Sequence, residues 1–137
     1  MTDTLASPQI HVHCFTDAPE FARRLLDHFP NLHIGITGVI SYSTNLNTAA
    51  LVRQMAGATA GSDGLRILLE TDAPFMVPSN IYGSLPELKG RLPLCHTAMI
   101  PWVADFTADV IGSGWGSANV MQRANQNARF VYGIDIS

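Results

Sequence analysis

The sequence RILLETDAPF, residues 66 to 75, places a run of mostly apolar residues directly before a polar turn. Its first part, residues 66 to 71, is apolar enough for a β-strand that is covered on both faces. Strands of this kind are typical of parallel sheets in α/β proteins. Asp72 follows this run directly, so its carboxylate is predicted at or just past the carboxyl end of the strand.

The N-terminal part of the chain contains a strand pattern followed by a helix pattern. Residues 10 to 15 alternate and predict a short strand. This alternation assigns His11, His13 and Phe15 to one face of the strand. A helix is predicted over residues 17 to 28, because apolar residues recur there on a single stripe.

The same order of elements then repeats before the third strand. A second strand is predicted over residues 32 to 37 and a second helix over residues 48 to 55. A glycine-rich break over residues 56 to 64 separates this helix from the strand at 66 to 71. Strands that alternate with helices pair in parallel, because each connecting helix packs back onto the sheet. The predicted fold class is therefore α/β.

The C-terminal half is predicted as one long loop and two helices. Residues 73 to 94 contain four prolines and little periodicity, which favours a loop. A helix is predicted over residues 99 to 111, with Gly112 after its last turn. The last helix is expected to begin with Ser117 as its N-cap and to end near Gly133.

Composition favours one folded domain over residues 1 to 137, since 47% of the residues are hydrophobic and 14% are charged. A net charge of −3 with only eight Lys and Arg residues excludes a broad electrostatic surface for nucleic acid. No apolar run approaches the ~18 residues of a membrane span, and the N-terminus lacks a signal-peptide pattern. We expect a cytoplasmic protein, with the nucleus as an alternative, no membrane partner, and reduced Cys14 and Cys95.

Candidate chemistry concentrates where the first and third predicted strands end. In parallel sheets and barrels, ligands gather at the carboxyl ends of strands. An imidazole from His13 and a carboxylate from Asp72 are suitable ligands for one divalent ion. Glu70 lies on an apolar strand, and because a buried acid is costly without partners, we expect it to accept hydrogen bonds.

Each of these features also has a structural interpretation. His11 and His13 are alternatively an ordinary pair of strand histidines. Asp72 before Ala-Pro is alternatively a turn residue that caps the next segment. His96 is interpreted as structural or solvated, and Cys14 as a small core residue, because no cation adjacent in sequence would lower its pKa.

Several motifs, taken in order, resemble the TatD family of metal-dependent hydrolases, which includes deoxyribonucleases. The resemblance covers nearly the whole chain beyond about residue 9, and its last two motifs are similar to the eukaryotic branch. The motifs are VHCFT at 12 to 16, IGITG at 34 to 38, LLETDAPF at 68 to 75, PLCHTAMIPWVADFTADV at 93 to 110 and NARFVYG at 127 to 133.

This resemblance implies the C-terminal part of a TIM-like (β/α)8 barrel, with the barrel incomplete in this chain. It assigns His13 and Asp72 as metal ligands, Asp72 also as the catalytic carboxylate, and Glu70 as a supporting acid. The implied cofactor is a divalent cation, Mg, Mn or Zn, and the implied substrate is DNA or another phosphodiester. The family's first-strand His-x-His pair, a glutamate and a further histidine have no counterpart, and His11 is not a family ligand.

Three hypotheses follow. In the first, the chain belongs to a phosphodiester-cleaving hydrolase and supplies two ligands of its metal site. In the second, it is a truncated, non-catalytic protein that has lost the other ligands. In the third, open sheet edges pair between copies, and His11, His13 and Asp72 build a site in a homo-oligomer. A missing N-terminal half is the other partner that would cover such edges.

Overall fold

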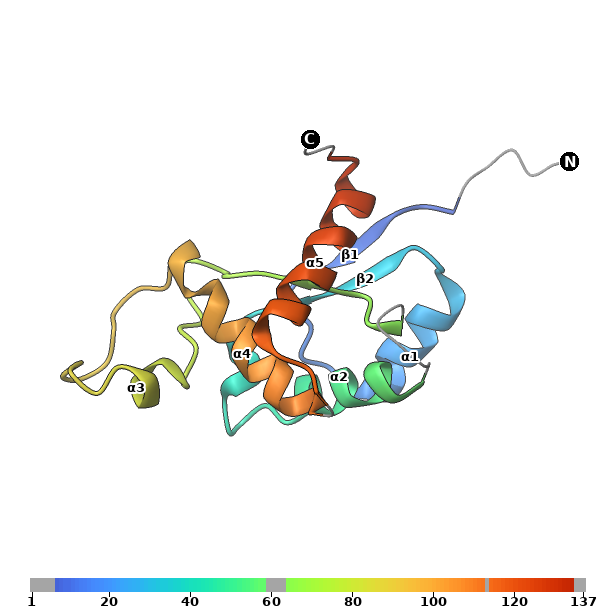
Figure 1. Ribbon diagram of the computed structural model, residues 1–137. Coiled ribbons are helices and arrows are strands. Elements are labelled where there is room, and N and C mark those ends of the chain that lie inside the picture. The colour runs from blue at the N-terminus through green and yellow to red at the C-terminus, as the bar shows by residue number, and fades with distance from the viewer. Residues whose placement is uncertain (1–6, 59–63, 113, 135–137) are drawn as a thin grey trace, which may run out of the picture.

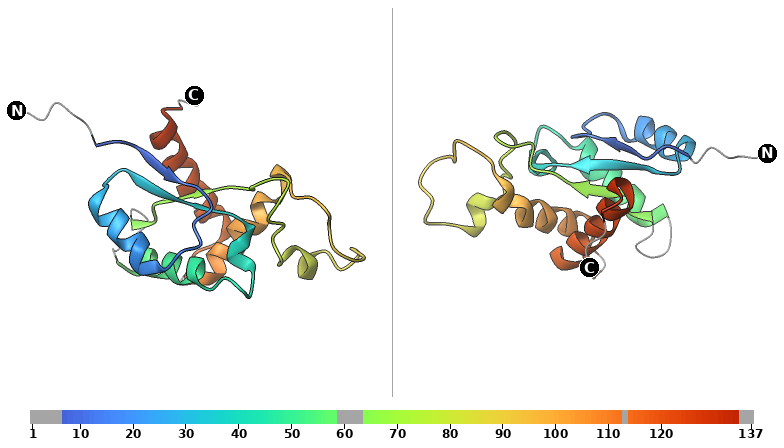
Figure 2. Two further views of the ribbon diagram at one scale, coloured as in Figure 1. Left: turned by 180° about the vertical axis from the view of Figure 1, so that it is seen from behind. Right: turned by 90° about the horizontal axis from the view of Figure 1, so that it is seen from above.

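The computed structural model describes residues 7–58, 64–112 and 114–134. Its centre is a parallel sheet in the order β1 (Ile10–Val12), β2 (Leu32–Ile36) and β3 (Ile67–Leu69). Figure 1 labels β1 and β2, and the right view of Figure 2 shows all three strands side by side. The register places His11 opposite His33 and Gly35 opposite Leu68. The predicted α/β class with parallel strands is thereby confirmed, whereas membership of a barrel stays a prediction.

Helices connect and cover these strands (Figures 1 and 2). None in the described parts of the chain is both long and apolar enough to cross a bilayer. The helices are α1 (Pro19–His28), α2 (Asn47–Ala58), α3 (Ile81–Ser84), α4 (Ile100–Ile111) and α5 (Ser117–Tyr132), with 3-10 turns η1 (Gly38–Ser41) and η3 (Thr97–Met99).

The four longer helices lie where the sequence predicts them, but the long predicted loop contains α3. A single helical turn is too short to display a 3.6-residue period, so its pattern could not be read from the sequence. The turn is held by packing instead: Ile81 is buried together with Cys95 and Met99. The N-terminus of α5 also differs slightly, because Gly116 is the N-cap and Ser117 is the first helical residue.

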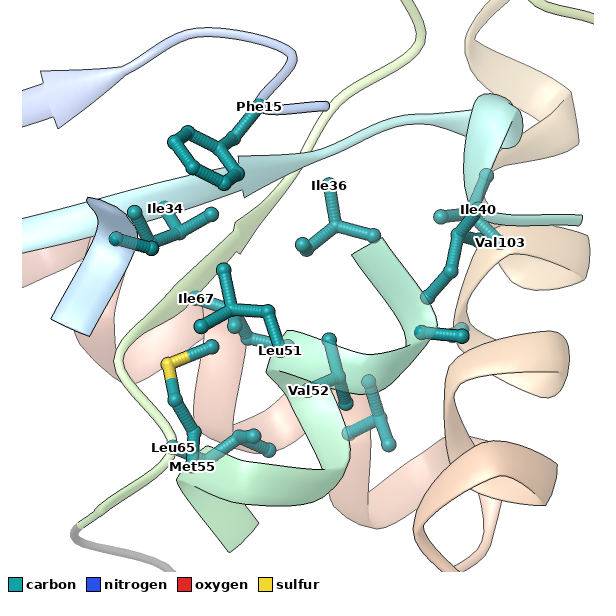
Figure 3. Packing of buried hydrophobic residues seen from close by; sticks show 14 of the residues in the cluster. Phe15, Ile34, Ile36, Ile40, Leu51, Val52, Met55, Leu65, Ile67 and Val103 are labelled. Carbon is teal, nitrogen blue, oxygen red and sulfur yellow. The ribbon is translucent and has the colours of Figure 1, made fainter. Parts of the chain in front are cut away.

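The main core lies between the sheet and its helices (Figure 3). Alternate residues of β2 and β3 point toward α2, which contributes its apolar face. The fully buried side chains include Ile34, Ile36, Leu51, Val52, Leu65 and Ile67. Burial of aliphatic side chains stabilises a domain by about 1.5–3 kcal/mol each, so this cluster fixes the register of the strands.

The first strand ends at Val12, not at Phe15 as predicted. Cys14 has a φ of 46°, a left-handed conformation that interrupts the alternation of faces. Phe15 therefore turns into the main core, 5% exposed, and does not share the face of His11 and His13. The assignment of Phe15 to the histidine face was wrong for this reason.

Of the two cysteines, Cys14 differs from expectation, whereas Cys95 lies in a loop as predicted. Cys14 is only partly buried and is not a core residue, and its Sγ lies 3.3 Å from Thr37 Oγ1. Cys95, predicted in a loop, is buried in the second cluster. Burial raises the pKa of both thiols, which for Cys14 agrees with the expectation that it is not an activated nucleophile.

The half-buried Arg66 side chain connects α1 to the sheet. The Arg66 guanidinium donates to the carbonyls of Leu26 and Phe29 at the end of α1 and to Leu32 O at the start of β2. Carbonyls at a helix C-terminus have no intrahelical donors, and a guanidinium satisfies them with favourable charge. Arg66 therefore fixes the angle at which the chain leaves α1 and enters β2.

In the part of the chain that the structure describes, no strand pairs with the outer edge of β1 or β3, and α5 packs along the edge of β3. The Asn127 side-chain amide donates to the carbonyls of Leu65 and Ile67, both at 2.9 Å. These two carbonyls point away from β2, because Arg66 O accepts from the neighbouring strand. The Asn127 amide thus supplies these two carbonyls with donors that a neighbouring strand would otherwise provide.

Asn127→Ala is expected to destabilise the fold by about 1–3 kcal/mol, because two carbonyls lose their donors inside a packed interface. Asn125→Ala is the matched control, since Asn125 is exposed on the same helix. Urea denaturation followed by circular dichroism measures both. Equal midpoints for the two variants would show that α5 does not depend on this contact.

Candidate metal centre

The two predicted ligands meet at the carboxyl edge of the sheet. His13 follows β1 and Asp72 follows β3, on the two outer strands of the sheet. Their nearest atoms, His13 Nε2 and Asp72 Oδ1, are 3.2 Å apart. The His13 side chain is 62% exposed, so a ligand can approach its ring from solvent.

Glu70 joins the two outer strands from the centre of the site. Its carboxylate accepts from His11 Nε2 at 2.5 Å, from His13 Nδ1 at 2.8 Å and from the Cys14 backbone N–H at 3.0 Å. Only 9% of the Glu70 side chain is exposed. These contacts agree with the expectation that Glu70 accepts hydrogen bonds.

Gly35 makes the reach of Glu70 possible. A Cβ at this position would lie 2.1 Å from Glu70 Oε1, which no side chain can accommodate without moving the carboxylate. The middle strand therefore needs a residue without a side chain where the carboxylate crosses it. This glycine lies within the IGITG motif, and a glycine inside an apolar strand is a sequence signal for a close approach of another group.

The negative charge of Glu70 and the positive charge of protonated His13 stabilise each other. The hydrogen bond that His13 donates to Glu70, followed by the negative charge of Glu70 and then by Asp72, raises the pKa of His13. Burial alone would raise the pKa of Glu70, but hydrogen bonds from His11, His13 and the Cys14 amide outweigh burial and lower it. Glu70 is therefore an anion, and it favours the protonated form of His13.

The turn interpretation of Asp72 and its position in the site are compatible. Asp72 has a φ of 54°, and its carbonyl accepts from the Phe75 N–H at 2.8 Å. The backbone thus forms a turn while the carboxylate faces His13. His96 lies outside this site: it is exposed and accepts from the Ala98 N–H at the start of η3, which agrees with its structural interpretation.

Two further aromatic neighbours were missed from the sequence. The Tyr132 hydroxyl lies 2.5 Å from His11 Nδ1, so both nitrogens of the His11 ring are engaged. His33 lies beside His11 in the register and is buried near Phe130, and burial lowers its pKa. The pairs Tyr132–His11 and Phe130–His33 join residues about a hundred positions apart, so local patterns could not reveal them.

The donor set fits a metal ion incompletely. An imidazole nitrogen and a carboxylate oxygen that share an ion at about 2.1 Å lie about 3.0–3.4 Å from each other, which matches the His13–Asp72 separation. Glu70 holds the other nitrogen of the His13 ring, an arrangement common behind metal-binding histidines. Within residues 7–58, 64–112 and 114–134, no group of three or more His, Cys, Asp or Glu side chains is arranged to hold a metal.

Comparison with known proteins places this chain in a family. The family model described as TatD related DNase matches residues 1–133. The chain belongs to this TatD-related family. A human protein named 3'-5' RNA nuclease TATDN2 is 36% identical over 77 residues, which cover 56% of this chain and 9% of that protein.

Two solved structures share the fold of this TatD-related chain. An uncharacterized amidohydrolase from Saccharomyces cerevisiae gives a TM-score of 0.61 at 18% identity over 90% of this chain, and a TatD family hydrolase from Entamoeba histolytica gives 0.59 at 16% over 88%. At such low identity the likeness shows the fold alone. This chain spans 40% of the yeast protein and 41% of the Entamoeba protein.

Glu70→Gln is expected to lower the pKa of His13 toward its ordinary value of 6.5, because a neutral amide replaces the anion that holds the ring. Asp72→Asn should lower it less, since Glu70 is the larger cause. Two-dimensional NMR of the histidine ring carbons during a pH titration measures both shifts. A His13 pKa that is unchanged in Glu70→Gln would contradict the assigned contact.

Proposed function

We propose that this chain contributes to a metal-dependent nuclease that hydrolyses phosphodiester bonds in DNA, with His13 and Asp72 as ligands of a divalent cation. One observation carries the proposal: His13 is held by Glu70 through Nδ1 while its Nε2 lies 3.2 Å from Asp72. In metal sites, a ligand histidine usually donates one ring N–H to a carboxylate or carbonyl, and its other ring nitrogen binds the ion beside a second ligand.

The residues of the site have separate roles in this proposal. Glu70 keeps the proton on His13 Nδ1 and orients the ring, and His11 in turn orients Glu70. Asp72 ligates the cation or accepts a proton from the attacking water. When bound, a Mg, Mn or Zn ion would lower the pKa of a water molecule and neutralise charge on a phosphate oxygen.

The substrate assignment rests on the family. Its description names a DNase, and the human relative is named an RNA nuclease, so both point to phosphodiester bonds in nucleic acid. The chain spans about two-fifths of the solved relatives, and we propose that the remaining ligands come from an N-terminal half or from another copy of the chain. The cytoplasm or nucleus remains the predicted compartment.

A second candidate is a non-catalytic protein that keeps the fold. The observation that favours it is the small donor set: within the described residues, no group of three or more potential ligands gathers. Two ligands hold a divalent ion weakly compared with the three or four protein ligands of zinc sites. Binding of metal by the purified chain separates the two candidates.

Isothermal titration with Zn²⁺ or Mn²⁺ is expected to show weak binding of one ion, which His13→Ala abolishes and His28→Ala preserves. Binding should strengthen as the pH rises through the raised pKa of His13, because the ion competes with the Nε2 proton. Binding that His13→Ala leaves intact would overturn the ligand assignment. Absence of binding at every pH would favour the non-catalytic candidate.

Mixing the chain with an N-terminal half of a TatD-related DNase and a divalent metal is expected to produce cleavage of DNA. His13→Ala and Asp72→Ala should each remove this cleavage, because each deletes one ligand. Gel electrophoresis of a labelled oligonucleotide gives the readout, and His28→Ala is the control. Cleavage that persists in both ligand variants would contradict the proposal.

A further inference from the structure

The His11 ring connects the proposed metal site to the end of α5. Its Nε2 lies 2.5 Å from Glu70 Oε1, and its Nδ1 lies 2.5 Å from the hydroxyl of Tyr132, the last residue of α5. The Tyr132 ring also packs edge-on against the His11 ring, with 6.0 Å between the ring centres. The C-terminal helix therefore contacts the histidine that holds Glu70.

The charge of Glu70 fixes the direction of these hydrogen bonds. An ionised carboxylate can only accept, so His11 must present Nε2–H to Glu70. A neutral imidazole carries a single N–H, and His11 Nδ1 is therefore an acceptor. The Tyr132 hydroxyl is its donor. Tyr132 thus donates to a ring whose own proton is committed to Glu70.

The two oxygens of the Glu70 carboxylate are divided among three donors. His11 Nε2 lies 2.5 Å from Oε1, whereas His13 Nδ1 at 2.8 Å and the Cys14 N–H at 3.0 Å bind Oε2. The contact with His11 is the shortest of the three. Because it holds Oε1, it keeps the carboxylate from rotating and leaves Oε2 aimed at His13 and Cys14.

Two carboxylates compete for the one proton of the neutral His13 ring. Glu70 Oε2 lies 2.8 Å from Nδ1, whereas Asp72 Oδ1 lies 3.2 Å from Nε2. The Glu70 side chain is 9% exposed and that of Asp72 is 26% exposed, so water weakens the Asp72 contact more. The shorter and drier contact places the proton on Nδ1. The lone pair of Nε2 is then free for a cation, as a metal ligand requires.

We propose that Tyr132 is a positioning residue for His13. Through His11 it holds the Glu70 carboxylate in place, and Glu70 in turn keeps the proton of the neutral His13 ring on Nδ1. This inference rests on the proposed metal site and adds the end of α5 to the elements that support it. Tyr132 acts through His11 and is not a ligand.

The Tyr132 hydroxyl can be removed without disturbing the packing of α5. The Tyr132 side chain is 58% exposed, whereas its neighbour Val131 is buried at 8%. Asn127 fastens the same helix to the edge of β3. Tyr132→Phe therefore deletes the bond to His11 and is expected to leave the helix in place.

NMR of the histidine ring nitrogens in the full chain tests the inference. The ¹⁵N shift separates a protonated nitrogen, a bare nitrogen and a bare nitrogen that accepts a hydrogen bond. EDTA removes metal and alkaline pH keeps imidazoles neutral, so the readout depends on neither metal binding nor cleavage. We expect Nε2–H on His11 and Nδ1–H on His13. A His13 ring with its proton on Nε2, which free histidine prefers, would overturn the inference.

Tyr132→Phe is expected to move the His11 Nδ1 resonance toward that of a bare nitrogen without a donor. The ratio of Nδ1–H to Nε2–H in His13 should fall at least about twofold, because the chain of contacts loses one hydrogen bond. Tyr82→Phe is the matched control, since it removes a hydroxyl from the second hydrophobic cluster and should change neither signal. A ratio in Tyr132→Phe equal to that of the original chain would overturn the role of Tyr132.

Two variants of His11 test the middle of the chain of contacts. His11→Gln presents an amide N–H to Glu70 and should retain Nδ1–H on His13, whereas His11→Leu offers no donor and should shift the proton toward Nε2. Equal ratios in these two variants would contradict the inference. If His11→Leu fails to fold, the comparison of Tyr132→Phe with Tyr82→Phe still decides. The expected tautomers in a chain that binds no metal would support the positioning contacts and contradict only the proposed function.

Discussion

The Glu70 carboxylate is the contact on which the arrangement of the site depends. It starts on β3, passes over Gly35 of the middle strand and accepts hydrogen bonds from His11, His13 and the Cys14 amide beyond β1. A nearly buried anion is stable only with such donors. The same bonds that satisfy it also fix the position of the His13 ring.

Two backbone turns, at Cys14 and Asp72, serve both the packing of the fold and the arrangement of the site. The left-handed Cys14 turns its amide toward Glu70 and lets Phe15 enter the core, so one backbone conformation serves both the carboxylate and the packing. Asp72 has a similar double role, because its backbone forms a turn while its side chain faces His13. Conformations that cost energy in isolation are maintained by the contacts around them.

The helix α5 packs along the outer edge of β3. Asn127 supplies donors to the edge of β3, and Tyr132 of the same helix reaches the His11 ring near the site. Membership of the TatD-related family agrees with the parallel sheet, and within the described residues His13 and Asp72 are not joined by a third side chain arranged to hold a metal.

The sequence by itself determined the α/β class, the places of the main helices and the nearness of His13 to Asp72. Periodicity and the rule that ligands gather at strand ends are local information, so they could be read without a structure. Only the tertiary structure decided that β1 stops at Val12, that Gly35 makes room for Glu70, and that Asn127 covers the sheet edge. These features depend on atoms brought together across 35 or more residues, and no pattern of neighbouring residues encodes such contacts.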